Sequence, residues 1–210
     1  CYLSAPKKYL REIKRFRPDY VLISCLVHNR FNVFYWSKKI KETLKGVKII
    51  IGNHFASSKP VEILKNIPWI DYVVVGEGEK IIAKLINSME EGNKRGLAGV
   101  CYRNGKKIIF KKNKAIVSVD DLPIPYLSIF NMDEYRFNLG GIEFLDIIPI
   151  SSSRGCPMLC TFCSCRVFEG SKYRSRSVEN IIDEIRQRKK DMLVGHFMFI
   201  DDTFTIDHQR

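Results

Sequence analysis

The sequence predicts an α/β protein built on a doubly wound parallel sheet. The first observation is that its strand-like runs are short and apolar along almost their whole length. The second is that amphipathic segments of helical period separate these runs. Strands of this kind are buried on both faces, and right-handed crossovers through the intervening helices then place helices on either side of the sheet.

The elements of this Rossmann-like part alternate in order. Pro18 ends the first predicted helix, and Gly46 ends the second. The predicted strands are residues 20–24, 47–51 and 72–75, and the predicted helices run through residues 9–16, 33–44, 61–65 and 81–89. Ligands of such sheets bind beyond the carboxyl ends of the strands. The loops expected there are residues 25–32, 52–58 and 76–79.

A change of pattern marks the end of this front part. Residues 100–103 and 106–110 flank Asn104-Gly105, which predicts a hairpin with a type I′ turn. Pro123 and Pro125 then fix an extended path, which indicates a domain boundary. The predicted organisation is a front domain of residues 1–119, a linker of residues 120–142 and a second domain of residues 143–210.

The second part is predicted to be strand, cysteine loop, helix and strand. Its strands are residues 147–150 and 197–200, and Ser177 is the expected N-cap of the helix between them. The predicted buried face of this helix consists of Val178, Ile181, Ile182 and Ile185. One and a half βα units cannot close a barrel, and the chain begins at Cys1 without an initiator Met. We therefore expect a fragment: an N-terminally incomplete front domain and the truncated start of a partial (β/α) barrel.

Composition excludes several classes of protein. Hydrophobic residues make up 45% and aromatic residues 11% of the 210 residues, so the chain can bury a core and is not disordered. It has neither a run of about 18 apolar residues nor a signal-peptide pattern, which predicts no membrane span and a cytoplasmic location. The formal net charge of +12 allows a nucleic-acid partner. The charges are spread along the chain, however, which favours a solvated lysine-rich surface.

Three of the seven cysteines fall within eight residues. Cys156, Cys160 and Cys163 have the spacing C-x3-C-x2-C, and without export signals reduced metal-binding thiolates fit better than disulfides. Three thiolates on one tight loop can bind three irons of a [4Fe–4S] cluster and leave the fourth iron open, as catalysis requires. Gly155 permits a sharp turn out of the preceding strand.

The alternative for this loop is a zinc site with Cys165 as the fourth thiolate. Structural zinc sites usually draw two pairs of ligands from separated elements, so we expect Cys165 to be a neighbouring or incidental thiol instead. Cys25 at a strand end and Cys101 in a hairpin strand are predicted core residues.

The cysteine loop resembles the signature of radical S-adenosylmethionine (SAM) enzymes, including the aromatic Phe162 before the third cysteine. In that family the open iron chelates SAM, and the reduced cluster cleaves SAM to a 5′-deoxyadenosyl radical. The resemblance implies that Phe162 lies beside the adenine and that Asp201 and Asp202, at the end of the next strand, contact the methionine amino group. This acidic pair looks like the variant of the cobalamin-associated branch.

Residues 17–24, 51–54 and 71–79 resemble the cobalamin-binding domain that precedes many radical SAM cores. Many such domains carry an Asp-x-His-x-x-Gly motif that places a histidine below the cobalt, and this sequence lacks it. The motif could lie upstream of Cys1, cobalamin could bind without a protein histidine, or the cofactor could be lost. The candidate cobalamin residues are Ser24, Gly52, His54, Gly76, Glu77 and Gly78. The alternatives are an exposed loop residue for His54 and a plain β-to-α turn for residues 76–78.

Three functions follow from these patterns. The favoured one is a cobalamin-associated radical SAM enzyme that performs methyl transfer, cyclisation or rearrangement on a small molecule, with a low-potential electron donor of flavodoxin or ferredoxin type. The second is an RNA-modifying, methylthiotransferase-like enzyme, although only Cys1, Cys25 and Cys101 lie outside the loop region, without the clustered triad that a further cluster needs. The third is a non-catalytic corrinoid- or metal-binding fragment. We expect the 210 residues alone to be inactive.

Overall fold

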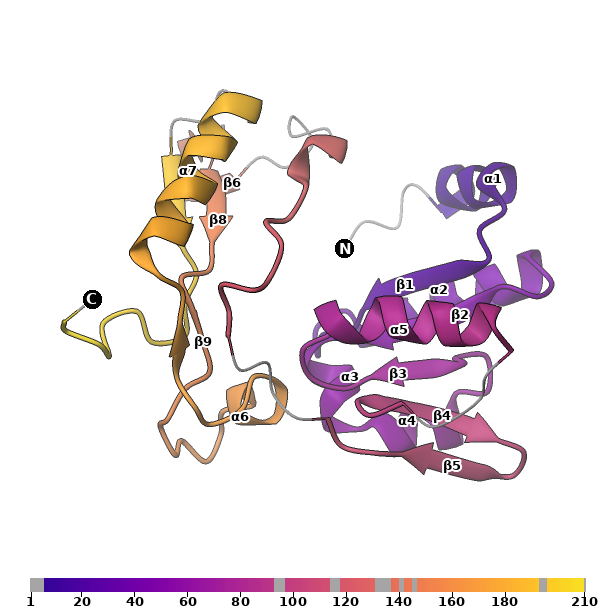
Figure 1. Cartoon of the computed structure of the whole chain (residues 1–210). Helices are drawn as coiled ribbons and strands as arrows, with labels where there is room; N and C mark the ends of the chain where they lie inside the picture. Colours follow the sequence, from indigo (N-terminus) through magenta and orange to yellow (C-terminus); the bar gives the residue numbers. More distant parts are fainter. Residues whose placement is uncertain are drawn as a thin grey trace. The chain divides into compact units, whose positions relative to one another are not determined.

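The computed structural model describes residues 6–92, 97–113, 118–130, 137–139, 142–144, 147–192 and 196–209. The chain divides into two compact units (Figure 1). The first contains residues 1–115 together with residues 162–169, and the second contains residues 116–161 and 170–210. The first unit therefore ends close to the predicted boundary at residue 119, but it also takes in a short segment from the predicted second domain. Residues 131–136 of the predicted linker lie outside the described residues.

The first unit is built on a five-stranded sheet whose strands lie side by side in sequence order. The first three strands are parallel, and the last two are antiparallel. The strands are β1 (Tyr20–Ser24), β2 (Lys48–Gly52), β3 (Tyr72–Val74), β4 (Val100–Asn104) and β5 (Lys107–Phe110). The predicted parallel sheet is confirmed, and the predicted hairpin continues it as an antiparallel edge.

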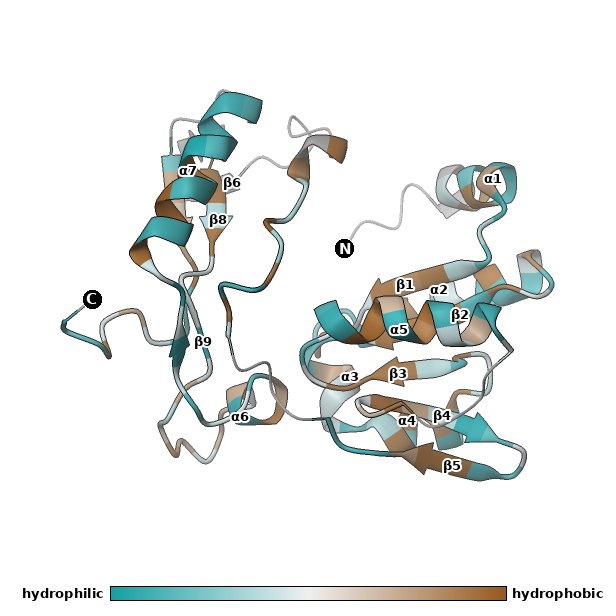
Figure 2. Cartoon of the chain, in the orientation of Figure 1, coloured by the Kyte–Doolittle hydropathy of each residue, from teal (hydrophilic) through white to brown (hydrophobic). Residues whose placement is uncertain are grey.

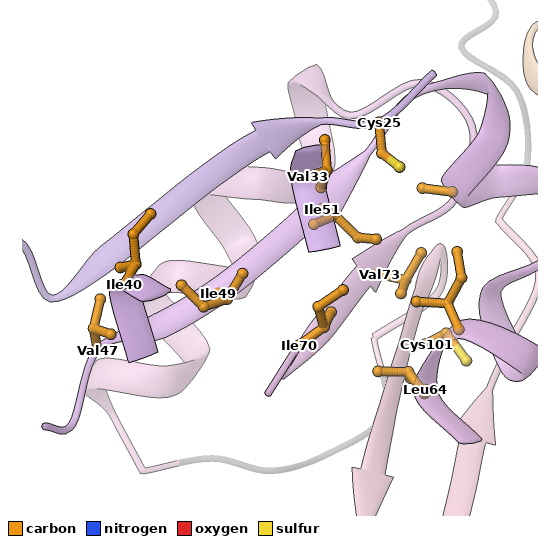
Figure 3. Packing of buried hydrophobic residues seen from close by; sticks show 12 residues of the cluster. Cys25, Val33, Ile40, Val47, Ile49, Ile51, Leu64, Ile70, Val73 and Cys101 are labelled. Atoms are coloured by element: carbon orange, nitrogen blue, oxygen red, sulfur yellow. The ribbon is translucent and has the colours of Figure 1, made fainter. Parts of the chain in front are cut away.

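Helices cover both faces of this sheet. They are α1 (Pro6–Phe16), α2 (Arg30–Thr43), α3 (His54–Ser58), α4 (Pro60–Asn66) and α5 (Glu79–Glu90). Ile49 and Ile51 of β2 face a core shared with α2, α3 and α4, whereas Ile50 points to the opposite face and packs with Ile81 and Leu85 of α5. Figure 3 shows the first of these cores, and Figure 2 shows the apolar strands between half-polar helices. Because successive side chains alternate across a strand, an apolar β2 requires helices on both sides.

Two local predictions in the first unit are wrong. Residues 54–58 form α3 rather than a loop, because Asn53 adopts a left-handed backbone with φ of 79° and its side chain caps the His54 N–H. The hairpin turn is also shifted by one residue, since Asn104 pairs with Lys107 and leaves Gly105 and Lys106 at the turn. Only Gly105 of these two has a positive φ, which is the pattern of a type II′ turn rather than type I′.

The second unit contains a parallel pair, β8 (Ile147–Ile150) and β11 (His196–Phe199), connected through helix α7 (Val178–Met192). Two short antiparallel pairs accompany it, and η1 (Leu127–Ile129) lies in the predicted linker. The pairs are β9 (Ser153–Arg154) with β10 (Arg174–Ser175), and β6 (Phe137–Leu139) with β7 (Ile142–Phe144). The predicted strand–loop–helix–strand order is confirmed. Helix α6 (Cys165–Phe168) follows the cysteine loop and belongs to the first unit.

The buried face of α7 differs from the predicted one. Ile181 is buried, but Val178 and Ile182 are exposed, and the helix instead buries Glu184 and Arg188. A buried ion pair makes this possible, because the Glu184 carboxylate lies 3.1 Å from the Arg188 guanidinium. The apolar side chains alone therefore do not identify the inner face. Ser177 is confirmed as the cap, since its hydroxyl accepts the Asn180 N–H at 3.3 Å.

Among the described residues, no helix is both long and apolar enough to cross a membrane.

Candidate functional site

The cysteine loop begins with a backbone turn that only glycine tolerates. Gly155 has a φ of 81°, a left-handed conformation that other residues rarely adopt. A Cβ added at Gly155 would also overlap the carbonyl oxygen of Lys172. Both observations confirm the expected sharp turn after β8, which directs the chain into Cys156.

The three candidate cluster ligands all carry thiols that form no disulfide. Cys156 is buried with 9% of its surface exposed, whereas Cys160 and Cys163 are exposed. Cys156 and Cys160 belong to the second unit, and Cys163 belongs to the segment of residues 162–169 in the first. Three unpaired thiols on one short irregular loop fit the donor set that an iron–sulfur cluster uses.

Cys165 differs from the other thiols of this region. It is buried at the start of α6, and its backbone N–H donates to the Cys163 Sγ atom over 3.5 Å. Hydrogen bonds to ligand sulfurs are one of the means by which proteins tune iron–sulfur clusters. The arrangement supports a role of Cys165 as a neighbour of the site, exerted through its backbone.

The predicted SAM residues lie in three different environments. Asp201 is half-buried and accepts hydrogen bonds from the backbone and side chain of Ser152 and from the hydroxyl of Ser153. Asp202 is exposed, and so is Phe162, with 91% of its surface accessible. The Ile200 N–H donates to the Ile150 carbonyl at 3.0 Å, so the β8–β11 pairing continues up to the acidic pair.

A cavity of about 270 Å³ lies where β1, β2 and β3 end in the first unit. The predicted residues Ser24, Gly52, Gly76 and Gly78 line it. Its other lining residues are Leu22, Ile23, Ile50, Ile51, Asn53, Val74, Ile82 and Phe168. The cavity therefore lies at the carboxyl ends of the parallel strands, as expected for a ligand of this sheet type.

The glycines give this cavity its open walls. A Cβ at Gly52 would lie 3.7 Å from the Val74 carbonyl oxygen, and one at Gly78 would lie 3.6 Å from the Val74 side chain. These are ordinary contact distances, so larger side chains at both positions would fill space that is now open. Glu77, the remaining residue of the predicted turn, is buried and does not line the cavity.

His54 also does not line the cavity. Its ring stacks on Phe168 with centroids 4.2 Å apart and an angle of 28° between the planes. Its Nδ1 atom lies 2.7 Å from the Asn53 Oδ1 atom, and the Asn53 amide nitrogen donates to the Ser24 hydroxyl at 2.9 Å. His54 is thus held by its neighbours rather than extended into solvent.

Sequence reasoning missed Asn53 and Phe168. Asn53 is in a left-handed conformation, which asparagine tolerates better than most residues, so its place directly after a strand was a usable signal. Phe168 also lines the cavity, although it lies 90 residues after Gly78, the last predicted cavity residue, in the sequence. No local pattern reveals such a contact.

A larger cavity of about 410 Å³ lies elsewhere in the first unit. Two of its charged lining residues, Asp71 and Arg103, are already engaged within the protein. Asp71 pairs with Lys41 at 2.7 Å and accepts the Ile49 N–H, and Arg103 donates to backbone carbonyls of residues 64, 67 and 70. The smaller cavity at the strand ends is therefore the better candidate for a cofactor.

Comparisons with known proteins match both parts of the chain. Residues 2–86 match the model of the B12 binding domain, and residues 150–210 match the model of the Radical SAM superfamily. An uncharacterized methyltransferase of Pyrococcus horikoshii is 30% identical over 200 residues, which cover 94% of this chain and 42% of the relative. The anaerobic magnesium-protoporphyrin IX monomethyl ester cyclase of Cereibacter sphaeroides is 26% identical over 208 residues, which cover 97% of this chain and 33% of the relative.

A solved structure shows the same fold. The cobalamin-dependent S-adenosylmethionine radical enzyme OxsB with aqua-cobalamin bound superimposes with a TM-score of 0.72 at 21% identity, covering 93% of this chain and 27% of that one. The chain thus spans less than half the length of these relatives. The comparisons confirm the predicted fold class and the predicted order of a B12-type domain followed by a radical SAM domain.

Proposed function

Because this chain belongs to the radical SAM superfamily and carries a B12-binding domain in front, we propose that the protein is a cobalamin-associated radical SAM enzyme. The observation that carries this proposal is the cysteine loop, with its three thiols after the glycine turn at Gly155. When bound, the cluster with SAM supplies the 5′-deoxyadenosyl radical, and cobalamin supplies a methyl-carrying or electron-accepting corrin. The reaction on a small molecule would be methyl transfer or cyclisation, as the names of the relatives suggest, or a rearrangement.

The cysteine loop and the acidic pair after β11 would hold the SAM side of the site. Cys156, Cys160 and Cys163 are the proposed cluster ligands. The exposed Asp202 is the proposed contact of the methionine amino group, and Asp201 supports it while holding the end of β8. The exposed ring of Phe162 is available to lie against the adenine.

The cavity of the first unit fits a part of cobalamin rather than the whole molecule. Its volume of about 270 Å³ is below the roughly 300–1,000 Å³ of pockets that enclose a drug-sized ligand. Its walls are mostly aliphatic side chains and glycines, which suit a flat aromatic base. We therefore propose that the residues lining this cavity would hold the benzimidazole tail of cobalamin.

The lining of the cavity bears on the missing histidine motif. Among the described lining residues there is no histidine, and His54 has one ring nitrogen directed to Asn53 and its ring face on Phe168. Of the three explanations for the missing motif, this arrangement favours binding of cobalamin without a protein histidine on the cobalt.

The buried cysteines argue against the RNA-modifying alternative. Cys25 and Cys101 both lie in the core of the first unit with no exposed surface (Figure 3). Burial raises the pKa of each thiol to about 11, so neither is a ready thiolate ligand at neutral pH. A second cluster ligated by these two residues is therefore disfavoured.

The proposed reductant is a low-potential donor of flavodoxin or ferredoxin type, because reductive cleavage of SAM consumes one electron.

The proposal is tested by anaerobic reconstitution of the purified protein with iron, sulfide and hydroxocobalamin. We expect about four irons per chain, an electron paramagnetic resonance spectrum that changes when SAM is added, and retained cobalamin. Cys156→Ala should lose the iron, whereas the control Cys101→Ala, in the core of the first unit, should keep it. Stoichiometric zinc without an iron signal would contradict the proposal and favour a structural metal site.

A further inference from the structure

Helix α6 is an outlying piece of the first unit. The segment that contains it, residues 162–169, begins two residues after Cys160, the second proposed cluster ligand, and groups with the first unit. Its main contact in this domain is α3, which begins at the end of β2. The same segment contains Cys163, the third proposed cluster ligand.

Phe168, the last residue of α6, contacts the region at the strand ends in three ways. Its ring stacks on His54, and its side lines the cavity proposed for the cobalamin tail. A Cβ added at Gly76 would lie 3.3 Å from the Phe168 carbonyl oxygen, so a side chain at position 76 would have little room. Phe168 is therefore a wall of the cavity and an anchor of α6 on the first unit.

The chain between Phe168 and Cys163 is short and internally bonded. The Val167 N–H donates to the Ser164 carbonyl at 3.0 Å, and the Glu169 N–H donates to the Cys165 carbonyl at 2.8 Å. The buried Cys165 then contacts the Cys163 sulfur through its own N–H, at 3.5 Å. Hydrogen bonds within residues 163–169 thus connect the short helix that ends at Phe168 to the sulfur of Cys163.

We propose that Phe168 is a positioning residue that couples the two cofactor sites, because it walls the cobalamin cavity and fixes the helix that begins two residues after Cys163. The inference rests on the proposed function. Cobalamin in the cavity and a cluster on Cys163 would both favour the docked position of α6. Two ligands that favour the same conformation raise each other's affinity by the same factor, commonly about 5-fold to 150-fold.

The test is the affinity of the purified protein for hydroxocobalamin, measured by equilibrium dialysis with and without the reconstituted cluster. The wild type should bind cobalamin at least about 5-fold more tightly with the cluster present. Phe168→Ala should bind equally in both states, and cobalamin should no longer alter the electron paramagnetic resonance spectrum of its reduced cluster. Val167→Ala, an exposed residue of the same helix, is the matched control and should behave as the wild type.

His54→Ala removes the ring that stacks on Phe168. This variant tests the coupling if Phe168→Ala does not fold. It too should lose the coupling. Wild-type coupling that persists in both variants would overturn the inference, and so would equal wild-type affinities with and without the cluster. A cluster-loaded wild type that binds no cobalamin at all would instead overturn the cobalamin part of the proposed function, and the inference with it.

Discussion

The carboxylate of Asp201 holds Ser152 at two points. Its Oδ2 atom accepts the Ser152 backbone N–H at 3.2 Å, and its Oδ1 atom accepts the Ser152 hydroxyl at 2.9 Å. Ser152 is buried, and it follows β8 and precedes the cysteine loop. This contact ties the end of β11 to the chain that enters the cluster site. Asp201 therefore has a structural role that its resemblance to a SAM contact did not indicate.

Asp201→Asn and Asp202→Asn should consequently have different effects. Asp201→Asn removes charge-assisted hydrogen bonds to a buried residue, and we expect a loss of about 1–3 kcal/mol in the free energy of unfolding, together with a lower iron content. Asp202→Asn changes an exposed side chain and should alter stability by less than about 0.5 kcal/mol while weakening SAM binding. Urea unfolding and titration calorimetry with SAM distinguish the two. Equal loss of stability in both variants would contradict this division.

Gly155→Ala should destroy the cluster site. The substituted residue would have to keep a φ of 81°, and its Cβ would overlap the Lys172 carbonyl oxygen. Gly46→Ala is the matched control, because Gly46 has a φ of 92° but no atom within 4 Å of the added Cβ. We expect the control to lose about 1–2 kcal/mol of stability and keep its iron. Gly155→Ala should lose iron as well, which metal analysis after reconstitution measures.

Glu184 should be among the most sensitive positions of the second unit. Its carboxylate lies 2.5 Å from the Arg176 guanidinium and 3.1 Å from that of Arg188, and all three side chains are largely buried. Glu184→Gln leaves two buried cations without their counter-charge, so we expect destabilisation by about 3–5 kcal/mol. The control is Asp183→Asn, which breaks an exposed pair with Arg186 and should cost less than about 1 kcal/mol. Chemical denaturation provides both values, and similar values for the two variants would refute the prediction.

The buried thiols should react only at high pH. Burial raises the pKa of Cys25 and Cys101 to about 11, so at pH 8 only about one thousandth of each is thiolate. In native apoprotein, iodoacetamide should modify the exposed Cys160 and Cys163 and leave the two buried thiols intact, as peptide mass spectrometry would show.

The neutral buried thiols stabilise the fold below pH 9, and this contribution is lost as the pH rises from 9 to 11. Early modification of Cys25 would contradict its placement in the core.

The parts of the fold that follow from local pattern could be predicted from the sequence. Apolar strands such as β2 and the cap at Ser177 depend mainly on neighbouring residues, and the glycine at position 155 itself signals the turn. Helix α3 could not be predicted from periodicity, because its five residues complete little more than one turn. The cap by Asn53 depends on a backbone conformation that the sequence only permits.

The remaining errors come from tertiary contacts. The apolar residues of α7 predict a different inner face from the one observed, because the helix buries the charged side chains of Glu184 and Arg188. They are tolerated inside because Arg176, which precedes the helix, completes their pairing. Phe168 joins the cavity from a distant segment in the same way. Interactions between residues far apart in sequence decide both cases.

The first unit is completed late during synthesis, because it includes residues 162–169, which follow residues 116–161 of the second unit. The five strands of the sheet, which lie side by side in sequence order, leave the ribosome before α6. Helix α6 emerges only after residues 116–161, which takes about 2–9 s at a usual rate of roughly 5–20 residues per second. For that interval the nascent first unit lacks the Phe168 wall of its cavity. A bulky cofactor would meet a wider entrance then than at any time after the chain is complete.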